Sequence, residues 1–169
     1  MAEVRAQQCC IVEAKTPQLV QHGITKAVIT DETLNHLLGV EYKQLIDTTG
    51  KIKECIAGFH HDYLNEMENK GLIKLLNKRI CPETGYIKAH LEYNGIVVKN
   101  KTFFPPHWTR KEVIEFIKGQ INAENAVIRH EHGVLVIESA TSEKVIIRAV
   151  LNADHSVKTV YPLLKHLEN

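Results

Sequence analysis

Residues 101–112 read Lys-Thr-Phe-Phe-Pro-Pro-His-Trp-Thr-Arg-Lys-Glu, and this stretch predicts a rigid junction between a strand and a helix. Thr109 is followed three residues later by a glutamate, which is the spacing of a helix capping box. Trp108 precedes the cap and Val113 lies four positions into the helix, so the two are spaced as a hydrophobic staple. Two prolines restrict the backbone between strand and cap. Lys101 leads this firmly held junction and is therefore a candidate for chemistry.

Regular hydrophobic patterns follow and precede this junction in the C-terminal half of the chain. Residues 86–93 alternate apolar and polar side chains, and Asn94-Gly95 is typical of a two-residue hairpin turn before apolar residues return at 96–98. Beyond the helix, short apolar runs separated by turn-like groups predict four strands, at 126–129, 134–138, 144–151 and 157–161. This half is therefore predicted to be α+β, with antiparallel sheets packed around the central helix.

The preceding part of the chain is predicted to be mainly helical. Leucines recur on one face from Asp31 and Gly39 ends the run, which predicts a short helix that carries His36 near its end. Residues 41–54 are polar and are expected to form a long loop with a turn at 48–51. A further helix is predicted from about His61 to Met67. The apolar residues within 71–78 predict that the helical structure continues there.

Residues 1–30 have weak periodicity, so we expect an N-terminal arm or edge strand there and a main domain over residues 31–169. With 169 residues, the chain is long enough to bury a real core. The formal net charge is only +1, so a nucleic acid would have to be held by a local site and not by a broad cationic surface.

Other sequence features bound the environment of the protein. The four cysteines have neither disulfide nor zinc-site spacing, so free thiols in a reducing compartment are expected. No apolar run is long enough to span a bilayer, and the N-terminus lacks the pattern of a secretory signal. We therefore expect a soluble protein without membrane contact, whose export would need other machinery.

Two histidines and one lysine are the groups that a metal-free ribonuclease needs. One imidazole takes the proton of the ribose 2′-hydroxyl, another protonates the departing 5′-oxygen, and an ammonium stabilises the charge at phosphorus. His60 follows Gly58 and precedes a predicted helix. The positive end of a helix dipole would keep such an imidazole neutral and able to act as a base.

Four motifs give these residue types a context. In chain order they are His36-Leu37-Leu38-Gly39, Ala57-Gly58-Phe59-His60, Lys101-Thr102-Phe103-Phe104-Pro105 and Thr159-Val160-Tyr161-Pro162. Together they resemble the motifs of the EndoU uridylate-specific endoribonucleases, and most closely those of the compact bacterial toxin-type members. The resemblance extends from Asp31 to the C-terminus.

The resemblance implies an EndoU-like fold with His60 as general base, His36 as general acid and Lys101 as electrostatic stabiliser. Thr159 and Tyr161 would bind uridine, the first by reading the uracil edge and the second by stacking. The implied reaction cuts single-stranded or loop RNA 3′ of uridine and leaves a 2′,3′-cyclic phosphate. No cofactor would be required, although manganese stimulates some relatives. A toxin of this kind would act on cytoplasmic RNA and would be matched by an immunity protein.

Two departures and two rival readings stay open at this level. Ala57-Gly58 stands where two glycines are common, and the neighbouring His61 competes with His60 for the role of base. A degraded site would make the protein an RNA- or protein-binding module. A metal hydrolase could instead use His60, His61 and Asp62 as ligands. Taken singly, Lys101 also fits an exposed lysine and Tyr161 fits a core aromatic.

Overall fold

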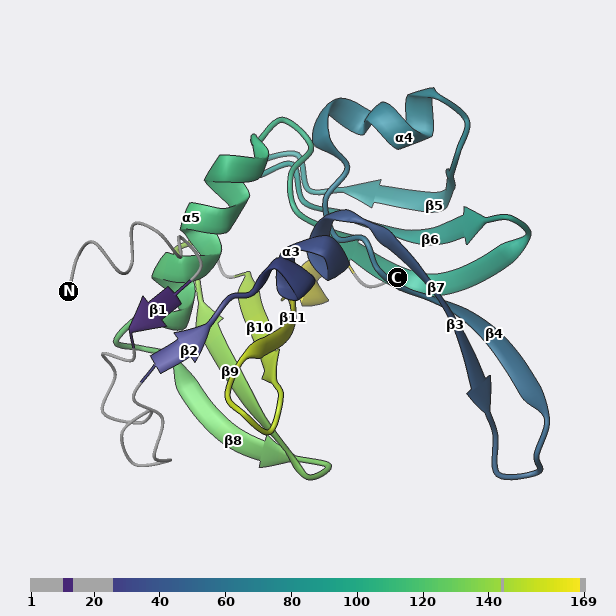
Figure 1. Cartoon of the computed structure of the whole chain (residues 1–169). Helices are drawn as coiled ribbons and strands as arrows, with labels where there is room; N and C mark the ends of the chain where they lie inside the picture. The colour runs from purple at the N-terminus through teal and green to yellow at the C-terminus, as the bar shows by residue number, and fades with distance from the viewer. Residues whose placement is uncertain (1–10, 14–25, 144, 168–169) are drawn as a thin grey trace.

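The computed structural model describes residues 11–13, 26–143 and 145–167, and these form an α+β fold with antiparallel strand pairs (Figure 1). The four-stranded sheet has the order β11-β10-β9-β8, with β8 at Val127–Glu131, β9 at Val134–Ala140, β10 at Ile146–Leu151 and β11 at Val157–Leu163. The three-stranded sheet has the order β5-β6-β7, with β5 at Lys74–Ile80, β6 at Ile87–Tyr93 and β7 at Ile96–Phe103. β11 and β7 are therefore edge strands.

Two hairpins and short helices complete the described residues. One hairpin pairs β1 (Ile11–Glu13) with β2 (Lys26–Val28), and the other pairs β3 (Val40–Ile46) with β4 (Ile52–Gly58), which projects from the body in Figure 1. The α-helices are α3 (Asp31–Leu38), α4 (Glu66–Asn69) and α5 (Arg110–Ile121). Two 3-10 turns, η1 (Tyr63–Asn65) and η2 (Lys165–Leu167), follow β4 and β11.

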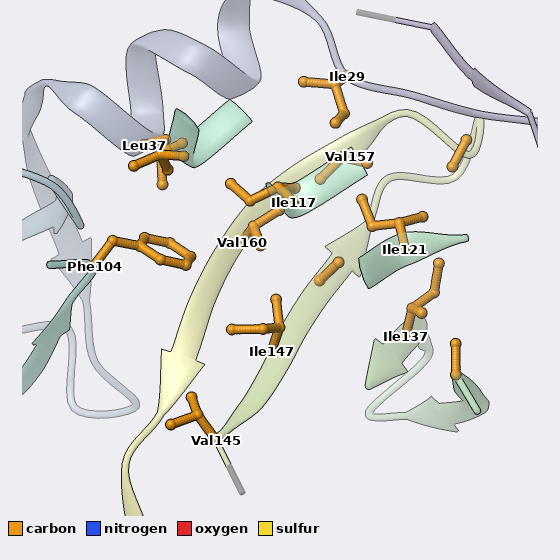
Figure 2. Close-up of a cluster of buried hydrophobic side chains, with 14 of the residues drawn as sticks. Ile29, Leu37, Phe104, Ile117, Ile121, Ile137, Val145, Ile147, Val157 and Val160 are labelled. Atoms are coloured by element: carbon orange, nitrogen blue, oxygen red, sulfur yellow. The ribbon is translucent and has the colours of Figure 1, made fainter. Parts of the chain in front are cut away.

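The larger hydrophobic core lies between α5 and the inner face of the four-stranded sheet (Figure 2). Val113, Ile117 and Ile121 recur on one face of α5 and are buried, as the 3.6-residue period requires. They meet side chains from alternate positions of the strands, such as Ile137 and Ile147. This packing fixes β11 in place through its neighbour β10.

A second, smaller core lies beneath the three-stranded sheet. Its buried members are Ile56, Phe59, Ile73, Ile87, Ala89, Leu91 and Phe103. Because β4 contributes Ile56 and β7 contributes Phe103, this core holds the end of the projecting hairpin against the edge strand β7. The smaller core therefore includes a residue of β7, and the larger core includes Val157 and Val160 of β11.

The strand-to-helix junction predicted from residues 101–112 is confirmed. Thr109 caps α5 and accepts a hydrogen bond from the Glu112 N–H at 3.1 Å, while the Glu112 side chain accepts from the Thr109 N–H. Trp108 packs on the large core, edge-on to Phe116 with ring centroids 5.0 Å apart. The hairpin at Asn94-Gly95 is confirmed as well, since it joins β6 to β7.

Three predictions for the preceding part of the chain are wrong. Residues 71–78, expected as a helix, contain most of strand β5, because an apolar run of that length suits a half-buried strand equally well. The helix expected from His61 to Met67 is reduced to η1 and the single turn α4. The loop expected over 41–54 is the hairpin β3–β4, and only the turn predicted at 48–51 lies where its two strands are joined. Exposed strands with mixed polarity lack the alternation that identifies a buried one.

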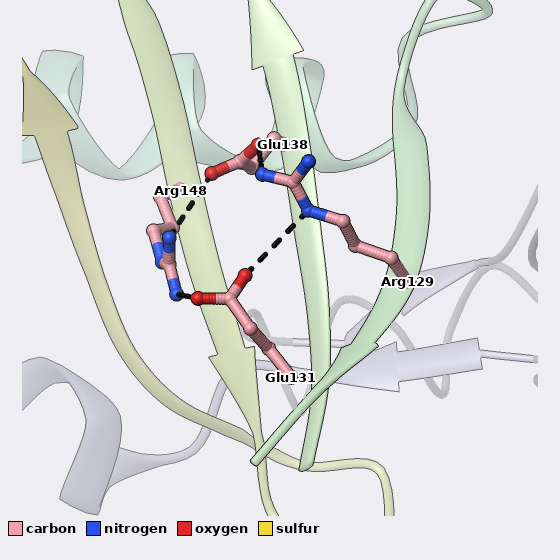
Figure 3. A network of polar contacts seen from close by, with 4 residues as sticks. All are labelled: Arg129, Glu131, Glu138 and Arg148. Carbon is pink, nitrogen blue, oxygen red and sulfur yellow. Dashed lines mark hydrogen bonds and ion pairs between the residues drawn. The ribbon is translucent and has the colours of Figure 1, made fainter. Parts of the chain in front are cut away.

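Four charged side chains form a closed network on the outer face of the four-stranded sheet (Figure 3). Arg148 contacts Glu131 at 2.7 Å and Glu138 at 3.2 Å, and Arg129 contacts both glutamates in turn. Two arginines and two glutamates therefore balance one another. Arg148 lies opposite Tyr161 in the β10–β11 register, so the network is adjacent to the gap beside β11.

The sequence also led to predictions for the cysteines, for membrane contact and for the N-terminal segment. Cys55 and Cys81 are free thiols, whereas Cys9 and Cys10 lie outside the described residues. Across the described ranges, no helix is long and apolar enough to cross a membrane. Ala27 and Ile29 are buried in the large core, while most of the predicted arm lies outside the described residues.

Candidate active site

A cavity of about 460 Å³ lies between the edge strands β7 and β11. All five residues singled out in the sequence line it, namely His36, His60, Lys101, Thr159 and Tyr161. They come from α3, the segment after β4, β7 and β11, so residues more than 120 positions apart share one site. The fold therefore brings the predicted site residues together.

The two histidines are placed by backbone contacts at the end of α3. The last carbonyls of a helix have no partner within the helix. Here the His36 carbonyl accepts from the Phe59 N–H at 2.8 Å, and the Leu37 carbonyl accepts from the His60 N–H at 2.7 Å. Gly58 has a φ of +72°, and a Cβ there would lie 2.1 Å from the His36 carbonyl oxygen. Only glycine permits this approach. The imidazole centroids of His36 and His60 are consequently 6.4 Å apart.

His60 is held as a neutral imidazole with a defined tautomer. Its Nδ1–H donates to the Thr102 carbonyl at 2.8 Å, which leaves Nε2 with a free lone pair. Burial and, to a smaller extent, the nearby Lys101 ammonium together lower the pKa of His60 to about 3. Its backbone carbonyl also accepts from the Phe104 N–H at 2.7 Å. The ring is therefore a fixed proton acceptor.

The physical reason expected for this neutral form is wrong. His60 is not the first residue of a helix, since residues 60–62 are irregular and η1 begins at Tyr63, and its N–H contacts the C-terminal end of α3 instead. The neutral form follows from burial and from neighbouring positive charge, not from a helix dipole. Neither the burial of His60 nor its proximity to Lys101 can be predicted from the local sequence pattern.

His61 points away from the cavity and does not line it. Its Nε2 lies 3.0 Å from the Trp108 carbonyl, within the junction that leads to α5. Asp62 faces in another direction, where its carboxylate accepts from the N–H groups of Met67 and Glu68 at the start of α4. His60, His61 and Asp62 thus have separate partners and do not form a ligand set. Within the described residues, no group of three or more His, Cys, Asp or Glu side chains is arranged to hold a metal ion.

His36 is oriented by a carboxylate that the sequence did not reveal. Its Nδ1 lies 3.1 Å from Glu41 Oε2, at the start of β3. A carboxylate at that position favours a proton on Nδ1 and fixes the ring orientation, as it does for many functional histidines. The His36 side chain is 13% exposed and Glu41 is 37% exposed, so this pair borders solvent. Nε2 is then the nitrogen left for a substrate.

Lys101 is buried without a counter-ion. It is 8% exposed, and its ammonium has no ion pair or hydrogen bond with any residue in the described part of the chain. Burial lowers the pKa of Lys101 to about 8, so the side chain is still mostly protonated at neutral pH. A buried cation without a partner is unfavourable for the folded protein. Its position in the cavity is therefore suited to an anion that arrives with a ligand.

Thr159 and Tyr161 lie two residues apart on β11 and so project from the same face. The Thr159 hydroxyl oxygen is buried and makes no hydrogen bond with the described residues, and Thr159 is part of the cavity lining. Tyr161 stacks on His60 with ring centroids 5.4 Å apart and an interplanar angle of 24°. Burial raises the pKa of Tyr161, so its hydroxyl stays protonated. An aromatic surface and an unpaired hydroxyl thus lie beside the two histidines.

Further residues of the site were not found from the sequence. Glu41 was placed in a predicted loop, and the cavity lining also includes Lys88, Lys99, Asn100 and Lys165. Lysines and asparagines are common on any surface, so only the fold distinguishes those that face the cavity.

Comparison of the sequence with models of known families finds one match, to the bacterial EndoU nucleases, over residues 30–164. Comparisons with curated proteins and with solved structures give no match. The family match begins at the cap of α3 and ends after β11, so it includes every residue of the site named above except Lys165. The resemblance drawn from the four motifs is thereby confirmed. The chain belongs to the bacterial EndoU nuclease family and is an endoribonuclease.

Proposed function

We propose that the protein cleaves RNA on the 3′ side of uridine by attack of the 2′-hydroxyl on the adjacent phosphorus. The observation that carries this proposal is one cavity that holds a neutral histidine, a carboxylate-oriented histidine and a buried ammonium. These are the groups that such a reaction requires at one phosphate.

His60 is the general base in this proposal. Its free Nε2 takes the proton of the 2′-hydroxyl while the 2′-oxygen forms a bond to phosphorus. His36, with Nδ1 held by Glu41, donates a proton from Nε2 to the 5′-oxygen as the P–O5′ bond breaks. The products are a 2′,3′-cyclic phosphate and a 5′-hydroxyl. The negative charge of a bound phosphate opposes the effects of burial and of Lys101, so it raises the pKa of His60 toward the range of an effective base.

Lys101 stabilises the charge that develops on the phosphoryl oxygens. Its ammonium is already desolvated and unpaired, so the interaction with phosphate does not require the loss of another partner. This is the arrangement in which a positive charge contributes most to a transition state. No metal ion enters the proposed chemistry, and activity is expected to persist in excess chelator.

Thr159 and Tyr161 select uridine in this proposal. Uracil presents acceptors at O2 and O4 and a donor at N3, so the unpaired Thr159 hydroxyl and a backbone group can read its edge. Cytosine lacks the N3 donor and would leave one buried partner unpaired. Tyr161 supplies the stacking surface, and its replacement by alanine should remove roughly 1–3 kcal/mol of base interaction.

The proposal is tested with oligonucleotides that differ only at one nucleotide, in buffer with excess chelator. Cleavage is expected after uridine alone, with a 2′,3′-cyclic phosphate identified by mass spectrometry. A 2′-deoxyuridine at the same position should resist cleavage, since it lacks the nucleophile. Cleavage of the deoxy substrate would exclude the mechanism, and equal cleavage after all four bases would exclude the uridine pocket. Binding without cleavage by the intact chain would identify a binding module.

We further infer that this nuclease acts as a bacterial toxin on cytoplasmic RNA, which is supported by the likeness of its motifs to the toxin-type members. Inducible production inside a bacterial cell should then arrest growth and cleave cellular RNA, whereas the Lys101→Ala protein should do neither. Co-production of an immunity protein encoded nearby should restore growth. Normal growth with abundant active enzyme would contradict the toxin role without affecting the chemistry.

A further inference from the structure

Besides the proposed catalytic groups, the cavity is lined by three further lysines, Lys88, Lys99 and Lys165, which we call the lysine wall. They line it together with Lys101, and among the described residues its lining contains no aspartate or glutamate. The chain as a whole is nearly neutral, with 21 Lys and Arg against 20 Asp and Glu. Positive charge is therefore concentrated here and not spread over the molecule. A concave surface lined by one sign of charge favours a ligand of the opposite sign.

Lys99 reaches the cavity because β7 contains a bulge. Ala89 of β6 pairs with Lys101 and Leu91 pairs with Val98, so two residues of β7 lie opposite one residue of β6. Asn100, the second of the two, has a φ of +55°. An extra residue of this kind bends a strand and redirects its side chains, and such bulges are common beside functional sites.

Lys88 occupies the strand next to this bulge. It pairs with Thr102 on one side and with Arg79 on the other, so two cations lie directly opposite each other across β5 and β6. Like charges in that arrangement destabilise a sheet. Lys88 has no ion pair with any described residue, in contrast to Lys74 and Lys78, which each contact a glutamate.

Lys165 is held beside the other two lysines by the C-terminal turn η2. Arg79 donates to the Leu167 carbonyl at 2.7 Å and to Asn100 Oδ1 at 3.3 Å. One side chain of β5 therefore ties the turn that carries Lys165 to the bulge that carries Lys99. The three lysines come from different elements but are fixed in one local structure.

We propose that Lys88, Lys99 and Lys165 form a second phosphate site, which binds a backbone phosphate adjacent to the one being cut. This inference rests on the proposed function. An RNA strand with one phosphate at His36 and His60 necessarily brings its neighbouring phosphates close to the same cavity. The lysine wall has the charge to bind them, and the described part of the chain places no carboxylate in the cavity lining to repel them. The enzyme thereby prefers RNA chains to single dinucleotides.

The test compares a substrate that has only the scissile phosphate with one that has neighbours. Uridylyl-adenosine, UpA, is the first, and an adenosine oligonucleotide with one central uridine is the second. For the wild-type chain, kcat/KM should be higher for the oligonucleotide. In the triple variant Lys88→Ala, Lys99→Ala, Lys165→Ala the ratio of the two kcat/KM values should fall about tenfold, because each exposed ion pair contributes up to about fivefold. UpA extended by a phosphate at its 5′ or its 3′ end then identifies the side that the wall binds.

Salt dependence and matched variants provide the controls. Replacing one phosphate-binding lysine should reduce the slope of log kcat/KM against log salt by about 0.7 for the oligonucleotide. The exposed Lys111 on α5 does not line the cavity, so Lys111→Ala should change neither ratio nor slope. Lysine-to-arginine changes in the wall should restore the ratio. An unchanged ratio in a folded, active triple variant overturns the second phosphate site. Failure of the wild-type chain to cut either substrate would instead overturn the proposed function.

Discussion

Two groups of cationic side chains in this protein differ in whether carboxylates accompany them. Arg129 and Arg148 on the outer sheet face are matched by two glutamates in a closed network (Figure 3). The lysines of the cavity between β7 and β11 share their lining with no carboxylate from the residues that the structure describes. A balanced network needs no further partner, whereas a concave cluster of one charge sign favours a ligand of the opposite sign. The two groups are near each other, because Arg148 lies opposite Tyr161 in the sheet and Tyr161 lines the cavity.

The largest expected effect comes from removing the buried cation of the cavity. Lys101→Met should lower turnover about 10²–10³-fold, because one stabiliser of the transition-state charge is lost. The folded protein should become more stable at neutral pH, by at most about 3 kcal/mol, since an unpaired buried charge is removed. Steady-state kinetics and thermal unfolding measure the two effects. A destabilised variant would assign Lys101 a structural role.

The pH dependence separates the buried lysine from an ordinary one. With a pKa of about 8 in the folded protein, Lys101 loses its proton well below the 10.5 of a free lysine, so kcat/KM should decline above about pH 8. The folded state then binds fewer protons than the unfolded state between about pH 8 and 10.5, so this residue makes stability rise with pH in that window. Lys101→Arg should shift the kinetic decline upward. A decline that stays at pH 8 in this variant would contradict the assignment.

The buried His60 should make the stability of the folded protein depend on pH in the acidic range. Its pKa is about 3 in the folded protein and near 6.5 when unfolded, so the unfolded state binds more protons between these values. This residue's contribution to stability should therefore decrease as pH falls from about 6.5 toward 3. A His60→Gln variant should show a weaker loss of stability over that range in acid unfolding curves. Parallel curves for the two proteins would mean that His60 is not buried as a neutral ring.

Breaking the balanced network should affect stability more than chemistry. Arg148→Ala removes the more buried of the two arginines that contact both Glu131 and Glu138, and we expect a loss of about 1–3 kcal/mol because hydrogen bonds to charged groups are removed. The half-exposed Arg129 is the matched control, and Arg129→Ala should cost less than about 1 kcal/mol. Chemical denaturation measures both. Equal losses would show that the network does not depend on the more buried arginine.

The smallest effect is expected for the carboxylate that orients His36. Glu41→Gln keeps a polar side chain but removes the charge, and turnover should fall up to about fivefold, because the pair is partly exposed. Binding of an uncleaved 2′-deoxyuridine substrate should be unaffected. A change in binding with equal turnover would place Glu41 in substrate recognition instead.

The parts of the fold that sequence predicts are those with local signals. The end of α3 at Gly39, the cap of α5 and the Asn94-Gly95 turn depend on neighbouring residues, and each lies where expected. Strand β5 was mistaken for a helix because its burial is decided by the distant β6, with which it pairs. The hairpin β3–β4 was missed because exposed strands need no hydrophobic alternation.

The candidate site shows the same division. The motifs identified five residues that line the cavity, since each lies in a distinctive local sequence. Glu41 and the lysine wall do not lie in distinctive local sequences. Their place at the site depends on the folded chain, which brings Glu41 to His36 and the lysines to the cavity. His60 and His61 are adjacent in the sequence, and only the fold shows that His60 lines the cavity while His61 contacts the Trp108 carbonyl.

The close approach of Gly58 to the end of α3 offers a practical tool. The two histidines are aligned through main-chain atoms, so Gly58→Ala should misalign them while every cavity side chain keeps its identity. Such a protein would hold an intact RNA with the natural 2′-hydroxyl in place and would cut it slowly. One methyl group on a residue outside the cavity lining would thus give a trap for capturing natural targets from cells.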